Sequence, residues 1–302
     1  MAQSESGNNL MDHSNETETK WKISDKGIVL KETPEPWIPK VLDIDPLREK
    51  VLLDEMERCI IETEKSEFYR KLKEQLQSPL ISKHMRRVLG SESKMQVIIY
   101  GIGNIEWHEK RNRMQLSLPI LMKKDFTWIG DIEIFDPILQ TIECRVMKAL
   151  GCSVCSFNEH GRREALKPTL FFMPFCQRTL IDNLLQTNWK ISLLKNIVLL
   201  GNSFKRNIDI SVRHLKLVSG DDQKIKKSDL GYIWVAKKFA NEFPIRTRFD
   251  DYGLPGYDEL PGRNSFHPFK GLSWHFFSNA TETKLSLDEG YLDVKKYLFK
   301  HI

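Results

Sequence analysis

An apolar run that stops at two closely spaced glycines constrains the fold of this chain more than any other feature. The run covers 95–100 and consists mostly of β-branched and aromatic residues without sustained alternation, and Gly101 and Gly103 follow it. This pattern is typical of a strand that is covered on both faces of a sheet. The two glycines permit a tight turn or a close backbone approach. The sequence therefore predicts a buried central strand that ends in a ligand-facing turn.

Four further strand-like runs alternate with segments of helical periodicity, and each ends in polar or small residues. These runs are 128–135, 152–157, 169–173 and 196–200, and a later aromatic run covers 272–277. Strand–helix alternation favours βαβ units and a parallel sheet. We therefore predict an α/β fold with a Rossmann-like open, mainly parallel sheet and flanking helices. The carboxyl ends of its strands should share one edge, where such folds bind ligands.

The segments around this core have distinct compositions, from which we predict the domain organisation. Residues 1–40 are polar and proline-rich, which predicts a disordered tail. Residues 41–90 predict a helical extension of two helices that separate at Pro79. We expect the α/β domain at 91–280, with an insertion at about 206–230, a Gly/Pro-rich loop at 250–268, and a C-terminal tail or short helix at 281–302.

Two helices of the core can be predicted from local signals. A helix is expected within 111–124, although Pro119 should cost about 3 kcal/mol in a helix interior. After the second strand, Asp136 and Pro137 form a typical helix start, with Asp as the N-cap and Pro at the first helical position. The apolar run 232–240 fits a strand or a helix.

Composition and charge exclude several classes of protein. The sequence contains no long apolar span and no signal peptide, and its five cysteines are an odd number, so we expect a soluble intracellular protein with reduced thiols. The net charge of +5 is spread among interleaved acids, which does not favour direct nucleic-acid binding. Cys152 and Cys155 are three residues apart in a predicted strand and have no second pair, so no metal site is predicted.

The glycine turn is the first candidate ligand site. Gly101 and Gly103 form half of a dinucleotide-binding fingerprint, and Asn104 follows them. Glu106 stands where the third glycine would be and places a negative charge beside any phosphate. The favoured interpretation is a structural turn whose Glu complements a helix dipole. The alternative is that Glu106 accepts hydrogen bonds from a ribose or an amine.

Other strand ends supply further candidates. Asp136 ends the second strand, where dinucleotide enzymes place a ribose-binding acid, but an N-cap role would already explain it. After the third strand, His160 offers acid–base chemistry, and paired arginines offer an anion grip; a solvated charged loop is equally compatible with this segment. The further residues considered as ligand-binding candidates are Glu159, Arg162, Arg163, Asn202, Ser203 and His275.

Six motifs in order resemble the plant family named Sensitivity to Red Light Reduced, over roughly residues 80–278. They are Tyr-Gly-Ile-Gly-Asn-Ile-Glu from 100, Trp-Ile-Gly-Asp-Ile-Glu-Ile-Phe-Asp-Pro from 128, Asn-Glu-His-Gly-Arg-Arg from 158, Thr-Leu-Phe-Phe-Met-Pro from 169, Gly-Asn-Ser-Phe from 201 and Ser-Trp-His-Phe-Phe from 273. Lys270, Gly271 and Leu272 depart from the family pattern, which would suit a divergent paralogue.

The resemblance implies a regulator of light signalling, linked partly to phytochrome B, that feeds the circadian clock. It also implies protein partners and a location in nucleus and cytoplasm, and it supplies neither a cofactor nor a catalytic residue. The competing hypothesis is a Rossmann-like small-molecule enzyme, methyltransferase-like or nucleotide-dependent. The clusters at the strand ends support this enzyme, and the missing third glycine weakens it. Fold analogy does not choose between the two.

Overall fold

The structure, a computed structural model, describes residues 23–24, 27–28, 34–39, 45–106, 110–219, 225–245, 268–286, 290–292 and 297. The chain divides into two compact units, 1–33 and 34–302. In the first unit, β1 (Ile23–Ser24) and β2 (Gly27–Ile28) pair antiparallel. All the other helices and strands described belong to the second unit.

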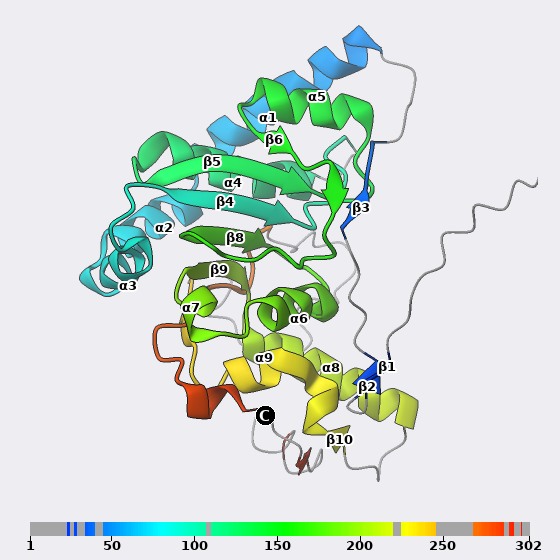
Figure 1. Ribbon diagram of the computed structural model, residues 1–302. Coiled ribbons are helices and arrows are strands. Elements are labelled where there is room, and N and C mark those ends of the chain that lie inside the picture. Colours follow the sequence, from blue (N-terminus) through cyan, green and yellow to red (C-terminus); the bar gives the residue numbers. More distant parts are fainter. Residues whose placement is uncertain are drawn as a thin grey trace, which may run out of the picture. The chain divides into compact units, whose positions relative to one another are not determined.

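A seven-stranded sheet forms the centre of the fold, in the order β11-β12-β9-β8-β4-β5-β6 (Figure 1). Five neighbouring strands run parallel: β9 (Ile197–Asn202), β8 (Thr169–Met173), β4 (Met95–Tyr100), β5 (Ile129–Phe135) and β6 (Ser153–Val154). β12 (Leu272–Phe276) runs antiparallel to β9, and β11 (Asn241–Pro244) runs antiparallel to β12. The predicted mainly parallel α/β sheet is therefore confirmed.

β4 is the first strand of this sheet along the chain, and the later strands are added on both sides of it. The chain proceeds from β4 to β5 and β6, and then returns to the other side of β4 to form β8 and β9. The strand order consequently reverses between β4 and β8, at the carboxyl edge of the parallel strands. In open α/β sheets, a crevice forms at such a reversal because the loops on either side of it turn to opposite faces.

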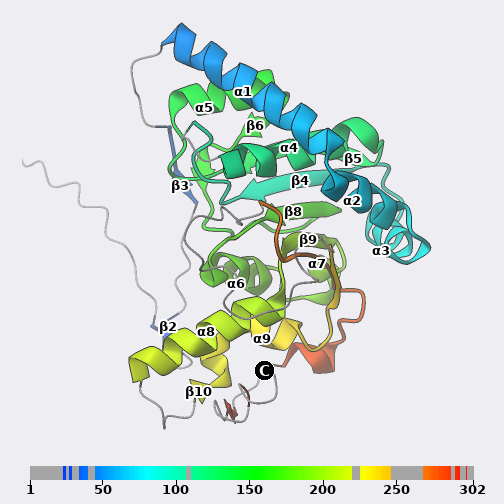
Figure 2. The same ribbon diagram turned by 180° about the vertical axis from the view of Figure 1, so that it is seen from behind.

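Helices cover both faces of the sheet (Figures 1 and 2). One hydrophobic core lies under α1 (Pro46–Lys65), α2 (Glu67–Gln77), α3 (Pro79–Leu89), α4 (Lys110–Asp125) and α5 (Thr141–Ala149). The other lies under α6 (Arg178–Thr187), α7 (Ile191–Leu194), α8 (Phe204–Ser219) and α9 (Gly231–Ala236). None of the helices in the described residues is both long and apolar enough to cross a membrane.

The helices differ from the predictions at their ends. The segment 46–89 forms three helices instead of two, because the Ser66 side chain accepts a hydrogen bond from the Tyr69 amide and starts α2. α4 continues through Pro119. Asp136 does not start α5. The N-cap of that helix is Gln140, four residues after Asp136, and its backbone amide donates a hydrogen bond to the Glu143 side chain.

Two segments for which irregular structure was expected contain regular elements within the described residues. The expected tail includes β3 (Glu35–Pro36), which pairs with β7 (Phe157–Asn158), and the Trp37 ring packs edge-on against Phe135. The pairing of β7 with β3 also divides the predicted strand 152–157 into β6 and β7. The expected insertion from 206 begins inside α8, whose buried Ile208 and Val212 lie on the core side.

The last part of the chain is partly described. The run 232–240 forms α9 and a turn instead of a strand. β10 (Ile225–Lys226) pairs with β13 (Tyr291–Leu292), so those two C-terminal residues form a strand where a tail or a short helix was expected. The described part of this region also contains the 3-10 helices η1 (Lys227–Leu230) and η3 (Glu282–Leu285). The rest of the expected terminal helix, apart from Tyr297, and most of the loop 250–268 lie outside the described residues.

Candidate functional site

The glycine turn after β4 requires glycine at both positions. Gly101 and Gly103 have φ angles of 68° and 74°, in the left-handed region that side chains disfavour. A Cβ on Gly101 would lie 2.5 Å from the Cys176 sulfur, and one on Gly103 would lie 2.7 Å from the Asn112 amide nitrogen. The glycines therefore permit close packing of the turn against the β8–α6 loop and against α4.

The backbone amides of this turn are occupied by groups of the protein itself. Gly103 donates to the Asp136 carboxylate at 2.8 Å, and Ile105 donates to the Glu143 carboxylate at 2.5 Å. Glu106 donates from its backbone amide to the Asn104 side chain at 2.9 Å. A phosphate held by these amides would have to displace carboxylates. The arrangement accords with a structural turn.

Glu143 organises the turn, and the sequence analysis missed it. Its carboxylate is fully buried and accepts hydrogen bonds from the Asn104 side chain and from the amides of Ile105 and Gln140. Burial raises the pKa of Glu143, and the hydrogen bonds from backbone amides oppose that rise. The spacing of Gln140 and Glu143, three residues apart at a helix start, was the signal that could have identified it.

Two of the candidate residues in this turn have structural partners. Asn104 is buried and is held by Glu143 and by Asn112, whose side chain donates to the Asn104 carbonyl. Glu106 forms a two-pronged ion pair with Arg48 of α1, with both nitrogen–oxygen distances at 2.9 Å. Neither side chain lines a described pocket at the strand edge.

The turn after β7 contains an internal ionic clamp. Arg163 donates to Glu159 at 2.7 Å and to Glu133 at 3.1 Å, and the Tyr100 hydroxyl donates to Glu159 at 2.5 Å. The hydrogen bonds with Arg163 lower the pKa of Glu133 against the opposing effect of burial. Arg163 therefore ties β5 to this turn. Its guanidinium is committed to two carboxylates of the protein.

Two other residues of this turn, Arg162 and His160, have hydrogen-bond partners on α6. The Arg162 side chain points to α6 and donates to Gln186 at 2.7 Å. His160 has a φ of 49°, and the Asn183 side chain donates to its carbonyl at 2.9 Å. The paired arginines thus face different partners and do not converge on one anion.

A pocket of about 470 Å³ lies where the carboxyl ends of β4 and β5 meet the turn after β7 and the start of α6. It contains three of the predicted residues, Gly101, Asp136 and His160. Its other lining residues are Tyr100, Phe135, Pro137, Asn158, Gly161, Phe175, Cys176, Gln177, Thr179, Leu180 and Asn183. We call this space the edge pocket. Sequence reasoning did not identify the β8–α6 loop as its wall because that loop carries no recognisable motif.

One wall of the edge pocket has a strained backbone. Phe175 has a φ of 54°, which is rare for a bulky side chain. The Asn202 side chain, at the end of β9, accepts a hydrogen bond from the Phe175 amide at 2.6 Å. Asn202, predicted to contact a ligand, therefore acts on the pocket through Phe175. Strain held in place by a neighbouring strand is a recurrent feature of binding sites.

The cysteine in the edge pocket is not an activated nucleophile. Cys176 donates its thiol hydrogen to the Tyr100 carbonyl at 3.2 Å. Burial raises the pKa of this thiol well above its usual range, and the charge of Asp136 adds to the rise. The thiolate required for nucleophilic attack is therefore disfavoured.

The remaining candidates, Ser203 and His275, belong to a separate buried cluster around Glu242 of β11. His275 of β12 is fully buried, its ring stacks on Phe204 at 4.1 Å, and its Nε2 lies 3.6 Å from the Glu242 carboxylate. Burial alone would raise the pKa of Glu242, but His275 and hydrogen bonds from Ser203 and Ser273 lower it to about 2. This cluster joins the antiparallel strands to α8.

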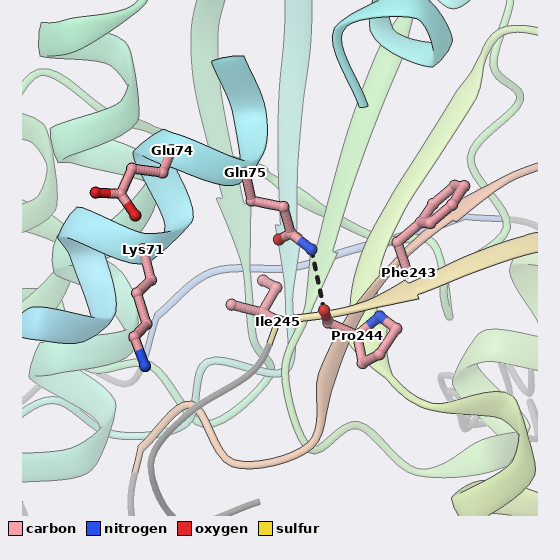
Figure 3. Close-up of a pocket in the computed structure, with 6 residues that line it drawn as sticks. All are labelled: Lys71, Glu74, Gln75, Phe243, Pro244 and Ile245. Carbon is pink, nitrogen blue, oxygen red and sulfur yellow. Dashed lines mark hydrogen bonds between the residues drawn. The ribbon is translucent and has the colours of Figure 1, made fainter. Parts of the chain in front are cut away.

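A second hollow, of about 490 Å³, lies along α2 and the outer strand β11, and Figure 3 shows its lining. There the Gln75 side chain donates to the Pro244 carbonyl at 3.0 Å and accepts from the Trp274 ring nitrogen at 3.2 Å. Both ends of the amide are thus used to hold α2 against the sheet. None of the predicted ligand residues lies here.

The described residues contain no group of three or more His, Cys, Asp or Glu side chains that could hold a metal ion. Cys152 and Cys155 are both buried free thiols. The described residues therefore provide no candidate metal site.

Comparisons with known proteins place the chain in a family. The model of the SRR1 domain matches residues 72–276. Protein SENSITIVITY TO RED LIGHT REDUCED 1 of Arabidopsis thaliana is 44% identical over 254 residues, which cover 84% of this chain and 84% of that protein. No solved structure was found to match the chain.

Animal relatives cover less of the chain. An SRR1-like protein of Mus musculus is 31% identical over 137 residues, 43% of this chain and 53% of that protein. An SRR1-like protein of Drosophila melanogaster is 35% identical over 71 residues, 24% of this chain and 26% of that protein. With the domain match and the extensive plant likeness, these findings show that the chain belongs to the SRR1 domain family.

Proposed function

We propose that the protein regulates red-light signalling, linked to phytochrome B and to circadian clock input, by binding partner proteins in nucleus and cytoplasm. The observation that carries this proposal is the 44% identity to a plant protein named for reduced sensitivity to red light, over 84% of both chains. Identity at this level over most of two chains favours a shared biological role.

We further propose that a small ligand in the edge pocket controls this activity. The pocket's volume of about 470 Å³ lies within the usual range for small-molecule sites. It adjoins the reversal of strand order, which is where open α/β sheets bind ligands. Its lining mixes aromatic and amide side chains, the composition that gives such sites both contact area and specificity.

A small-molecule enzyme, methyltransferase-like or nucleotide-dependent, is the second candidate. The observation that favours it is the same Rossmann-like position of the pocket. One observation opposes it: the amides of Gly103 and Ile105 in the glycine turn are engaged with carboxylates. The regulator is therefore the better-supported reading.

Complementation in plants tests the proposal. The chain would be expressed in Arabidopsis lacking the 44% identical relative, and seedling stem length would be measured under red light and in darkness. We expect the chain to restore the response to red light. Failure of an accumulated, folded protein to do so would refute a shared role in light signalling.

A pocket-filling variant tests the ligand. Thr179→Trp places an indole at an exposed position of α6 that lines the edge pocket. Ser192→Trp, at an exposed position of α7 outside it, is the matched control. We expect only Thr179→Trp to abolish complementation while both variants keep the wild-type melting temperature. Full complementation by Thr179→Trp would show that signalling does not require an open pocket.

A further inference from the structure

We infer that the edge pocket takes a phosphate-free heteroaromatic molecule, neutral or cationic, of the nucleobase or nucleoside type. The inference rests on the proposal that this pocket binds a ligand, and it adds the chemical class of that ligand. Charge, backbone hydrogen bonding, and the shape and polarity of the walls support it separately.

The charge of the lining disfavours anions. Among the described residues of the lining, Asp136 is the only one with a permanent charge, and none is a lysine or an arginine. The two arginines of the adjoining turn are bound elsewhere, Arg163 to carboxylates and Arg162 to Gln186. Arg111 lies 5.9 Å from the centre of the Phe175 ring but does not line the pocket. A phosphate would therefore meet a negative charge without a cation in the lining to offset it.

The backbone of the glycine turn adds to this exclusion. Phosphate-binding turns present free amides to the ligand. Here Gly103 donates its amide to Asp136 at 2.8 Å, and Gly101 donates to the Phe135 carbonyl at 3.4 Å. Asp136 thus occupies the position that a phosphate would take, and its carboxylate has lone pairs left for hydrogen-bond donors of a ligand.

The part of the lining that α6 contributes offers both donors and acceptors. It contains the first residues of α6, a helix of ten residues whose N-cap, Gln177, makes no side-chain capping bond. The amide side chains of Asn158, Gln177 and Asn183 also line the pocket. Amides can pair with both kinds of polar atom, and a heterocyclic base presents both kinds along one edge. A ligand with a donor for Asp136 and acceptors for α6 matches these two parts of the lining.

Aromatic rings favour a flat ligand. Tyr100, Phe135 and Phe175 all line the pocket, and Phe175 holds its position through a strained backbone that Asn202 secures. Aromatic side chains provide stacking surfaces that tolerate any base. The lining therefore combines flat apolar contacts with polar edges.

The test compares ligands that differ only in phosphate. Binding of adenosine, guanosine, cytidine and uridine to the full chain would be measured by isothermal titration beside the matching 5′-monophosphates and ATP. We expect at least one nucleoside to bind, and its monophosphate to bind about tenfold more weakly, which corresponds to ~1.4 kcal/mol. Asp136→Asn should reduce that difference, whereas Glu106→Gln, in the glycine turn that contacts Asp136 but outside the pocket, should not.

Two outcomes would overturn the inference. One is a monophosphate or ATP that binds as tightly as its nucleoside. The other is that no nucleoside binds with a dissociation constant of about 1 mM or tighter, which corresponds to ~4 kcal/mol of binding free energy. If a phosphate-bearing ligand binds and Thr179→Trp still abolishes complementation, the ligand class is wrong and the proposed function stands. If Thr179→Trp complements fully, the ligand-controlled function fails as well.

Discussion

Nε2 of His275 lies 3.6 Å from the Glu242 carboxylate, and Nδ1 of the same ring lies 3.2 Å from the Leu199 carbonyl oxygen. Both ring nitrogens of His275 therefore lie near oxygen atoms of the protein. The pair connects β11, β12 and β9 beneath the start of α8, where the Phe204 amide also donates to Glu242. It ties the antiparallel edge of the sheet to its parallel centre.

This pair makes stability depend on pH in acid. The folded-state pKa of Glu242 is about 2, below the ordinary value of about 4.3. The ionised carboxylate therefore stabilises the fold fully above that ordinary value, and the contribution is lost as pH falls towards 2. We expect a loss on the order of 3 kcal/mol, measured by urea unfolding at a series of pH values. Glu242→Gln should lose this part of the pH dependence; an unchanged profile would contradict the pairing.

Arg163 should contribute more to the stability of the fold than Arg162. Arg163→Ala leaves Glu133 and Glu159 without their partner, which should cost about 3 kcal/mol. Arg162→Ala removes one hydrogen bond to Gln186 and should cost about 1 kcal/mol. Thermal unfolding of the two variants measures the difference. Equal, small losses would show that Arg163 is not an internal clamp.

Gly101→Ala should destabilise the fold through two separable effects. The added methyl would lie 2.5 Å from the Cys176 sulfur, and the φ of 68° is itself unfavourable for alanine. In Gly101→Ala with Cys176→Ala, the clash with sulfur is removed, so only the conformational cost of about 1 kcal/mol should remain. A double-mutant cycle by urea unfolding measures this coupling. Purely additive effects would contradict the close contact.

Asn202→Ala should loosen the Phe175 wall of the edge pocket. The Phe175 amide would lose its acceptor, at a cost of about 1–3 kcal/mol for a buried donor. We expect faster hydrogen exchange at 174–177, measured by mass spectrometry. Asn207→Ala, which loses hydrogen bonds to backbone carbonyls in the same region, serves as the control. The same exchange rate in Asn202→Ala and wild type would show that Asn202 does not hold Phe175.

Local sequence signals predicted the parallel strands and most helices because those elements carry their own patterns. β8 and β9 are largely apolar runs, and α6 has a periodic apolar face. The starts of α2 and α5 were missed because they depend on single side-chain hydrogen bonds, from Tyr69 to Ser66 and from Gln140 to Glu143. β3 was missed because two residues pair with a distant strand and have no local pattern of their own.

For the candidate site, the sequence by itself determined which residues end the parallel strands, because alternation of strands and helices sends those ends to one edge. It thereby identified Gly101, Asp136 and His160, which line the edge pocket. Only the tertiary structure decided what the other candidate residues do. The role of an ionisable side chain depends on the group with which it pairs, and these groups lie on distant segments of the chain. Glu106 pairs with Arg48, Arg163 with Glu133, and His275 with Glu242, across separations that no local pattern encodes.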